Sequence, residues 1–258
     1  GVVIEDGELV EFRKIDSGRR IRSEKVRVSE RLGDPSAPKS VSLIAIHQHK
    51  IPNIFPEDVL LQSKKASFLQ NKKWDDYSHV PFVTIDPKDA RDHDDACYAK
   101  PDDDPKNIGG HLIWVAIADV AHFVRSGDAI DNEARHRGNS TYFPDRVVPM
   151  LPDNLSGNLC SLHEGEKRAC IVVKIKIDSV GNKISHKFTR AVIQSWASLE
   201  YGEVQEVIDK GKGKPKVLDL VNTVIKPLYD AYSCLKISRK ARSPLDLNLP
   251  ERKIEIDE

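Results

Sequence analysis

The amino-acid sequence predicts a mixed α+β domain built around a largely antiparallel sheet. Residues 169–178 and 183–195 read as strands on either side of the turn signal Ser179-Val180-Gly181-Asn182, which predicts a hairpin. Residues 111–120 form a nearly continuous apolar run of strand length and β-branched character. Residues 217–240 instead carry apolar side chains at helical spacing, interrupted by Pro227. Helices packed against a buried sheet are therefore expected.

Length and composition are those of a globular chain with a substantial core. The chain has 258 residues, 39% of them hydrophobic, enough for one large domain or for one domain with an appendage. It contains no apolar run of about eighteen residues and no signal-peptide pattern at its N-terminus, which argues against membrane insertion and secretion. The 40 basic side chains balance 40 acidic ones, so a polyanion would have to be bound by local patches.

The four cysteines are expected to be structural thiols. They lie far apart in the sequence, with no CxxC pair and no histidine pair at metal-binding spacing, at Cys97, Cys160, Cys170 and Cys234. This pattern indicates reduced, mostly buried thiols and favours a cytoplasmic protein.

The N-terminal segment predicts short strands followed by a domain boundary. Residues 2–4 and 9–12 flank the turn signal Glu5-Asp6-Gly7, a hairpin pattern. A basic run follows that could form one face of a small RNA-binding barrel, although a solvated strand face explains it equally well; its members are Arg19, Arg20, Arg22, Lys25, Arg27 and Arg31. Residues 32–38 are rich in proline and glycine, so we expect a domain edge there.

The elements beyond this edge are expected to alternate. Residues 41–47 form a short apolar run that reads as a strand, and Pro56 opens a predicted helix that reaches about residue 71. Residues 80–85 and 96–99 read as strands on either side of an acidic loop. A short polar helix is expected at 128–137.

The acidic loop carries the clearest chemical signal of the sequence. Asp86, Asp92, Asp94 and Asp95 follow a D-x5-D-x-D-D pattern that Lys88 and Arg91 only partly offset, so a cation between the carboxylates would relieve their repulsion. Oxygen ligands select a hard ion, and Mg²⁺ or Mn²⁺ in such a site would suit phosphoryl-transfer chemistry. The alternatives are a calcium site or a simple solvated turn, although the EF-hand pattern is absent.

A second segment, residues 137–162, is irregular and contains aromatic side chains. Tyr142 and Phe143 lie beside prolines, where an exposed ring on a stiff loop could stack on a base of single-stranded RNA. Aromatic side chains in such loops are more often packed, and packing is the favoured interpretation for Phe143.

Three tracts resemble the RNB catalytic domain of the ribonuclease II and ribonuclease R family. They are residues 84–96, residues 115–124 and residues 140–162, which occur in the family's order and approximate spacing. The resemblance extends from about Gly33 to the C-terminus. Residues 31–35 and 42–47 are most similar to the bacterial ribonuclease R branch.

The resemblance implies a processive 3′-to-5′ hydrolytic exoribonuclease that uses Mg²⁺ and converts single-stranded RNA to nucleoside 5′-monophosphates. Asp86, Asp92, Asp94 and Asp95 match the family's catalytic and metal-binding aspartates; Asp86 and Asp95 match direct ligands, and Asp94 matches the residue most critical for cleavage. Tyr142 matches the tyrosine that packs on the terminal base. The resemblance implies framework roles at three further positions, Asp119, His122 and Cys160.

The resemblance also implies an incomplete catalytic domain. Residues 1–32 are expected to be the remnant of a cold-shock or OB-type barrel, and residues 33–258 the N-terminal portion of the RNB domain, so the chain alone could be inactive. One competing hypothesis is an RNA-binding protein with an inactive RNB domain, which loss of motif aspartates would favour, and none is lost. Another is an unrelated Mg²⁺-dependent phosphatase or calcium-stabilised domain, for which the acidic loop alone would suffice.

Overall fold

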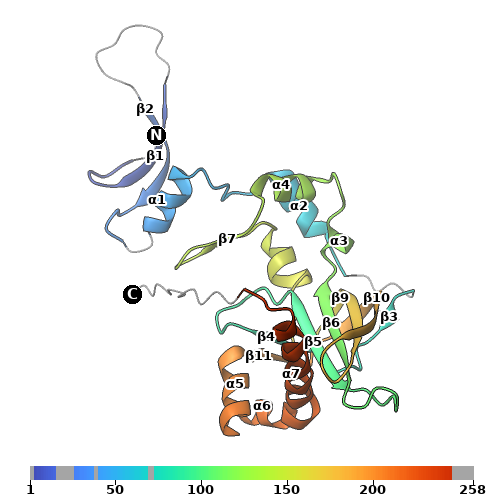
Figure 1. Ribbon diagram of the computed structural model, residues 1–258. Helices are drawn as coiled ribbons and strands as arrows, with labels where there is room; N and C mark the ends of the chain where they lie inside the picture. Colours follow the sequence, from blue (N-terminus) through green and yellow to red (C-terminus); the bar gives the residue numbers. More distant parts are fainter. Residues whose placement is uncertain (1–2, 16–25, 38–39, 69–72, 246–258) are drawn as a thin grey trace. The chain divides into compact units, whose positions relative to one another are not determined.

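The computed structural model describes residues 3–15, 26–37, 40–68 and 73–245, which form two compact units (Figure 1). Unit 1 comprises the described residues up to Glu57 together with Glu133–Met150. Unit 2 comprises Asp58–Asn132 and the described residues from Leu151 onward. Each unit is considered by itself.

Unit 2 is built on a seven-stranded sheet with the strand order β11-β4-β5-β6-β9-β10-β3. Its four central pairings are antiparallel, whereas β11 with β4 and β10 with β3 are parallel, which confirms the predicted mixed and largely antiparallel sheet. The strands are β3 (Asp75–Asp76), β4 (Val83–Asp86), β5 (Asp95–Pro101), β6 (His111–Ala118), β9 (Lys167–Ile177), β10 (Lys183–Gln194) and β11 (Ala197–Glu200).

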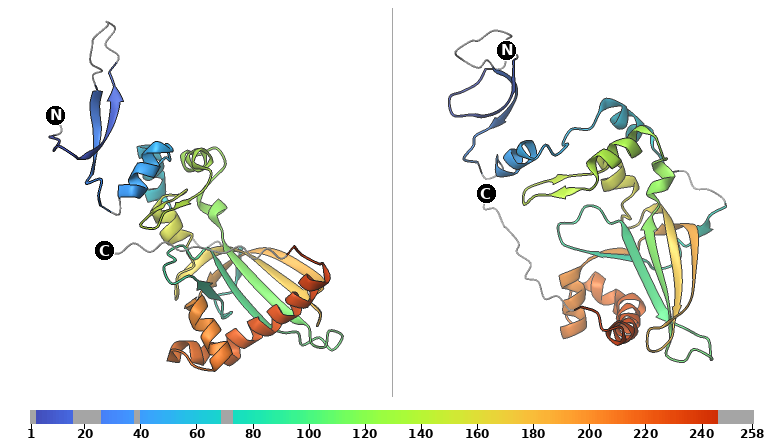
Figure 2. Two further views of the ribbon diagram at one scale, coloured as in Figure 1. Left: turned by 60° about the vertical axis from the view of Figure 1, so that its left-hand side comes forward. Right: turned by 45° about the horizontal axis from the view of Figure 1, so that its top comes forward.

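The predicted C-terminal helix is present but divided. Helix α6 (Pro215–Leu220), the π-helical turn η2 (Val221–Ile225) and α7 (Lys226–Ala241) follow one another, and Pro227 lies in the first turn of α7. Proline is tolerated there because the first N–H groups of a helix have no partner within it. Figure 2 shows α7 lying along one face of the sheet.

Two apolar clusters attach these helices to the sheet. Beneath α7, Ala231 packs with Ala99, Ile113 and Ile177 from three neighbouring strands. The second cluster joins β4 and β11 to α5 (Tyr201–Lys210), α6 and η2, and its buried members are Val83, Ala197, Leu199, Val204, Val207, Val217, Val224 and Ile225. These two clusters of the core therefore lie between the sheet and the C-terminal helices.

The shorter helices of the chain agree with the sequence in position more than in length. Helix α2 (Glu57–Lys65) ends before the predicted residue 71, and residues 69–71 lie outside the described part. Helix α4 (Ala129–Arg137) confirms the predicted polar helix. The remaining short helices are α3 (Val120–Phe123) and the π-helical turn η1 (Leu155–Leu159).

In unit 1, two predictions were wrong. The Glu5-Asp6-Gly7 turn does not join two strands; β1 (Leu9–Lys14) pairs instead with β2 (Val26–Gly33). The apolar run 41–47 is not a strand but helix α1 (Ser40–Gln48), because a short apolar run without clear periodicity is compatible with either state.

The two-stranded β1–β2 sheet is what the structure shows of the predicted barrel remnant, and no closed barrel occurs in the described residues. The basic positions 19, 20, 22 and 25 lie outside those residues. The domain boundary between residues 32 and 33 stays a prediction. None of the helices in the described ranges combines the length and the apolarity needed to cross a membrane.

Candidate functional site

The carboxylate-rich loop joins two adjacent strands of the unit 2 sheet. Strand β4 is buried at Val83, and its last residue, Asp86, is only 8% exposed. Pro87 ends the strand, because proline lacks the N–H group that a sheet ladder requires. The chain returns antiparallel as β5, which begins at Asp95, and Val83 pairs with Cys97. Asp86 and Asp95 therefore lie at the same end of neighbouring strands.

Hydrogen bonds to distant segments fix the main chain of this loop. The His93 N–H donates to Ser161 Oγ at 3.1 Å, and the Leu162 N–H donates to the His93 carbonyl oxygen at 2.7 Å. The Ala118 N–H, at the end of β6, donates to the Asp94 carbonyl oxygen at 2.9 Å. These contacts hold the part of the loop that carries the carboxylates from two sides.

The imidazole of His93 also holds a carboxylate. His93 Nδ1 lies 2.7 Å from Asp86 Oδ2, and both side chains are largely shielded from solvent. The ring of His163 stands edge-on to His93 at 6.2 Å between centroids, and His163 Nε2 lies 3.0 Å from the Gly157 carbonyl oxygen. Asp86 is thus oriented by a residue within the loop, and one of its oxygens already has a partner.

The carboxylates lie near enough to influence one another. Burial raises the pKa of Asp95 above its usual range, and the negative charges of Asp94 and Asp86 raise it further. Burial likewise raises the pKa of the Cys97 thiol to about 12, with Asp95 and Asp86 adding to the rise. Three of the four predicted aspartates therefore share one region of negative potential, where a cation would be stabilised. The fourth, Asp92, is exposed in the same loop.

The donor chemistry of this region suits a hard divalent cation, because carboxylate oxygens are its preferred ligands and repulsion at Asp95 would be relieved by one. In the conformation described here, however, no three His, Cys, Asp or Glu side chains of the described residues are grouped as a metal site. Assignment of Asp86, Asp92, Asp94 and Asp95 as ligands stays a prediction.

Tyr142 belongs to unit 1, where it ends strand β7 (Thr141–Tyr142). This strand pairs with β8 (Val147–Val148), and the Phe143 N–H donates to the Arg146 carbonyl oxygen at 2.8 Å to close the turn. The Tyr142 side chain is 65% exposed, while Phe143 is half-buried, in keeping with the packing expected for it. Tyr142 therefore has the exposure that base stacking needs.

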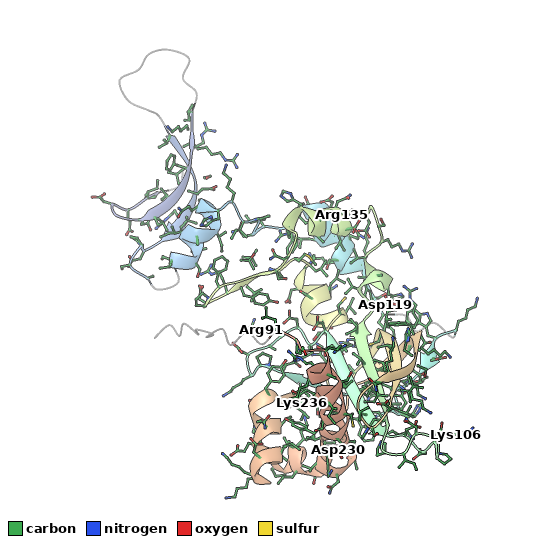
Figure 3. The ribbon with its side chains drawn as sticks, viewed as in Figure 1. Arg91, Lys106, Asp119, Arg135, Asp230 and Lys236 are labelled. Carbon is green, nitrogen blue, oxygen red and sulfur yellow. The ribbon has the colours of Figure 1, made fainter. Side chains whose placement is uncertain are left out.

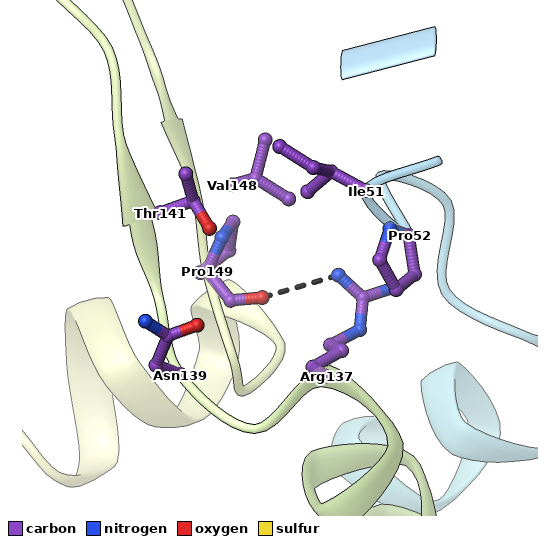
Figure 4. A pocket seen from close by; sticks show the side chains of 7 residues that line it. All are labelled: Ile51, Pro52, Arg137, Asn139, Thr141, Val148 and Pro149. Carbon is purple, nitrogen blue, oxygen red and sulfur yellow. Dashed lines mark hydrogen bonds between the residues drawn. The ribbon is translucent and has the colours of Figure 1, made fainter. Parts of the chain in front are cut away.

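Arg137, whose role was not predicted from the sequence, braces this hairpin from within unit 1. Its Nη1 donates to the Pro149 carbonyl oxygen at 3.1 Å (Figure 4), and its Nη2 donates to the Ile54 carbonyl oxygen at 2.9 Å. Its Nε donates to Glu133 at 2.8 Å, and the guanidinium carbon lies 3.6 Å from the centroid of the Phe55 ring. The cavity of about 10 Å³ beside it has room for no more than one water molecule.

The three residues with expected framework roles contact other parts of the fold or are buried in it. Asp119 is 2% exposed and its carboxylate lies 3.0 Å from Arg190 Nε. His122 packs edge-on against Trp74 at 4.9 Å between ring centroids. Cys160 is buried, and burial raises the pKa of its thiol to about 12, which favours the packing role expected for it. All four cysteines are free.

Comparison with known proteins supplies a family. The RNB domain model matches residues 74–258, which include the carboxylate loop, Asp119, His122, Cys160 and Tyr142. Ribonuclease R of Vibrio cholerae is 36% identical over 253 residues, covering 96% of this chain and 30% of the relative. The chain thus spans about a third of that protein.

Solved structures agree with the sequence comparison. Mycoplasma genitalium RNase R in complex with double-stranded RNA superimposes with a TM-score of 0.83 at 29% identity, covering 98% of this chain and 44% of the other. The same protein in complex with ribose-methylated single-stranded RNA gives a TM-score of 0.79 at 30% identity, covering 91% and 36%. The likeness therefore extends through both compact units.

Proposed function

The chain belongs to the RNB domain family, and on that basis we propose that it is part of a processive 3′-to-5′ exoribonuclease. The proposed reaction is hydrolysis of single-stranded RNA to nucleoside 5′-monophosphates, dependent on Mg²⁺ or Mn²⁺. The observation that carries the proposal is the carboxylate cluster: Asp86 ends β4, Asp95 begins the adjacent antiparallel strand β5, and Asp94 lies beside it in the connecting loop. Burial and then the charges of Asp94 and Asp86 raise the pKa of Asp95.

In this proposal Asp86, Asp92, Asp94 and Asp95 hold the divalent cation. A bound cation would polarise the scissile phosphate and activate a water molecule for in-line attack. Asp95 is carried on the regular strand β5, which limits its movement. Asp86 is oriented by His93, and the main-chain bonds to Ser161 and Leu162 keep the loop in place. Fixed ligands of this kind reduce the reorganisation that catalysis requires.

Tyr142 is proposed to stack on the terminal base of the RNA. Its exposed ring ends a strand whose neighbouring turn is closed by the Phe143–Arg146 hydrogen bond, so little freedom is lost when a base stacks on it. Stacking does not depend on base identity, which suits an enzyme that degrades any sequence. The RNA complexes of the Mycoplasma genitalium relative support RNA as the ligand.

We also propose residues 33–258 as the N-terminal portion of the RNB catalytic domain, with 1–32 as the remnant of a barrel, in a cytoplasmic protein. The family match over 74–258 supports the first of these assignments. The chain covers about a third of its relatives, so its activity is best tested both alone and in a hybrid. The hybrid is Vibrio cholerae ribonuclease R in which this chain replaces the matching segment.

The experiment is a gel time course with single-stranded RNA labelled at its 5′ end in one series and at its 3′ end in another. The hybrid should convert the 5′-labelled RNA to a short final product with little accumulation of intermediates, and it should release the 3′ label at once as a mononucleotide. Retention of RNA binding without cleavage, with the parent enzyme active, would contradict the proposal and favour the RNA-binding alternative. Internal cleavage products would contradict the exonuclease assignment.

A further inference from the structure

An open groove of about 700 Å³ lies in unit 2 between helix α7 and the hairpin formed by β9 and β10. Ile175 and Ile177 contribute apolar side chains from β9, and Tyr232 and Leu235 contribute them from α7. The remaining lining is polar or small, and its cations are Lys183, Lys236, Arg239 and Arg242. We call this the distal groove.

The hairpin turn approaches helix α7 closely at Gly181, which lines the distal groove. Gly181 has φ +83°, and a Cβ atom there would come within 2.1 Å of the Cys234 carbonyl oxygen and 2.9 Å of the Leu235 Cα atom. Only glycine allows this contact between the turn and the main chain of α7. Tyr232, Lys236 and Arg239 follow at helical spacing, so they share one face of α7; Lys236 is labelled in Figure 3.

The distal groove lies at the end of the sheet away from the carboxylates. Asp95 begins β5 opposite Ile117, whereas Pro101 ends it opposite His111, which pairs in turn with Ile177. Six positions of a strand span about 20 Å at roughly 3.3 Å per residue. The groove and the candidate active site are therefore separate surfaces of one sheet.

Ion pairs within the described residues do not offset the positive charge of the distal groove. Within the described part of the chain, no carboxylate forms an ion pair with Lys183, Lys236, Arg239 or Arg242. By contrast, three exposed lysines elsewhere on the unit each pair with a neighbouring carboxylate, namely Lys210 with Glu206, Lys214 with Glu203 and Lys226 with Asp230. Positive charge that the fold leaves uncompensated is available to an external anion.

We propose that the distal groove binds single-stranded RNA, as a second contact separate from the carboxylate cluster. The choice of RNA over other polyanions rests on the proposed function. The chemistry of the groove fits it: cations meet the phosphates, and the exposed ring of Tyr232, 53% accessible, offers a stacking surface. Lys236 Nζ lies 5.5 Å from the centroid of that ring, so charge and aromatic surface lie side by side.

The length of RNA that reaches both surfaces follows from their separation. At about 3.4 Å per stacked nucleotide, roughly six nucleotides span the distance along the sheet. The distal groove would then hold the strand several nucleotides from the bond that is cut. Its contribution is affinity for longer RNA rather than chemistry.

The test measures binding of fluorescein-labelled 12-nucleotide oligouridylate to this chain in EDTA, where no metal-dependent cleavage occurs, over a range of salt concentrations. The triple variant Lys183→Gln/Lys236→Gln/Arg239→Gln should bind about tenfold more weakly at roughly 0.1 M salt. The slope of log affinity against log salt should fall by about 2, since each phosphate contact contributes about 0.7. Tyr232→Ala should weaken binding about fivefold without changing the slope.

The matched control is Lys210→Gln/Lys214→Gln/Lys226→Gln, which removes the same charge from ion-paired positions and should bind RNA within about twofold of the parent chain. Circular dichroism checks that each variant is folded. Equal losses in both triple variants, or none in the groove variant, would overturn the proposal. Equally tight binding of polyglutamate of the same charge would overturn it in favour of an acidic protein partner.

Cleavage by the hybrid enzyme is recorded separately. Cleavage with unaltered binding by the groove variant would refute the distal site alone. Loss of binding in the groove variant would support the distal site even if the hybrid did not cleave, so the two proposals fail independently.

Discussion

The two ends of the unit 2 sheet carry charge of opposite sign. At one end Asp86, Asp94 and Asp95 gather negative charge on a loop between adjacent strands. At the other, the distal groove gathers cations along α7 and the β9–β10 turn. At the same end, outside the groove lining, Lys176 pairs with Asp102 at 2.9 Å, so part of the charge there is neutralised within the fold. The two ends therefore offer surfaces of opposite charge to a ligand.

Removal of divalent metal should give the largest difference between the functions proposed for the two ends. With EDTA, RNA cleavage by the hybrid enzyme should fall by about a thousandfold or more, because the carboxylates would then repel the phosphate they are meant to hold. Binding of 12-nucleotide RNA by the chain itself should change less than about twofold, because the distal groove uses protein cations. A gel assay and fluorescence anisotropy measure the two quantities. An equal loss of cleavage and of RNA binding would indicate that both depend on the same metal-dependent site.

The distal end depends on close contact between the turn and the helix. Gly181→Ala should lower the free energy of unfolding by roughly 2–4 kcal/mol, because a Cβ atom would meet the Cys234 carbonyl oxygen and φ is positive. Gly127 has φ +84° with open space around it, so Gly127→Ala should cost only about 1 kcal/mol. Urea unfolding gives both values. Equal costs would show that the turn does not press on α7.

Loss of the Tyr142 ring in unit 1 should have a smaller effect on RNA binding. Tyr142→Ala in the hybrid should weaken binding of four-nucleotide RNA about fivefold and lengthen the final product, since a stacking contact is lost. Val147→Ala, on the partner strand of the same hairpin, is the control and should change neither. An unaltered product ladder would remove Tyr142 from RNA binding.

The smallest expected effect is on stability, from removal of the Asp102 charge that Lys176 neutralises at the distal end. Hydrogen bonds from Asn107 and Lys176 hold the pKa of Asp102 at about 2. A lowered carboxylate pKa stabilises the folded state above the unfolded pKa of about 4 and loses this effect as the pH falls through about 2. Asp102→Asn should therefore lower the urea midpoint at pH 7 and have little effect near pH 2. A difference that persists at pH 2 would assign the stabilisation to another cause.

The central sheet could be predicted because its strands carry their own signals. Residues 111–120 and the two strands around Gly181 have long apolar or alternating patterns, and the aspartates are adjacent in sequence. The prediction of a strand at residues 41–47 was wrong because the nine residues of α1, three of them serine or glutamine, show neither the helical nor the strand period clearly. Local sequence also could not show that β1 skips the near turn and pairs with β2 across a longer connection.

The supporting contacts of the candidate site could not be predicted because they join distant residues. Ser161 reaches His93 across 68 positions, and Arg137 reaches Ile54 across 83. Ser161 lies in the tract of residues 140–162, and His93 lies between Asp92 and Asp94, so the sequence indicated that both segments matter without indicating that they contact each other. Their roles follow from the fold alone.

The most direct test of the account is the Asp94→Asn change in the hybrid enzyme, measured as both cleavage and RNA affinity. Cleavage should fall by at least about a hundredfold while RNA binding is kept or strengthened, because one negative charge near the phosphate is removed and the metal site is disturbed. Cleavage at the parent rate, with the protein folded and RNA bound, would show that Asp94 takes no part in catalysis and would contradict the proposed role of the carboxylate cluster.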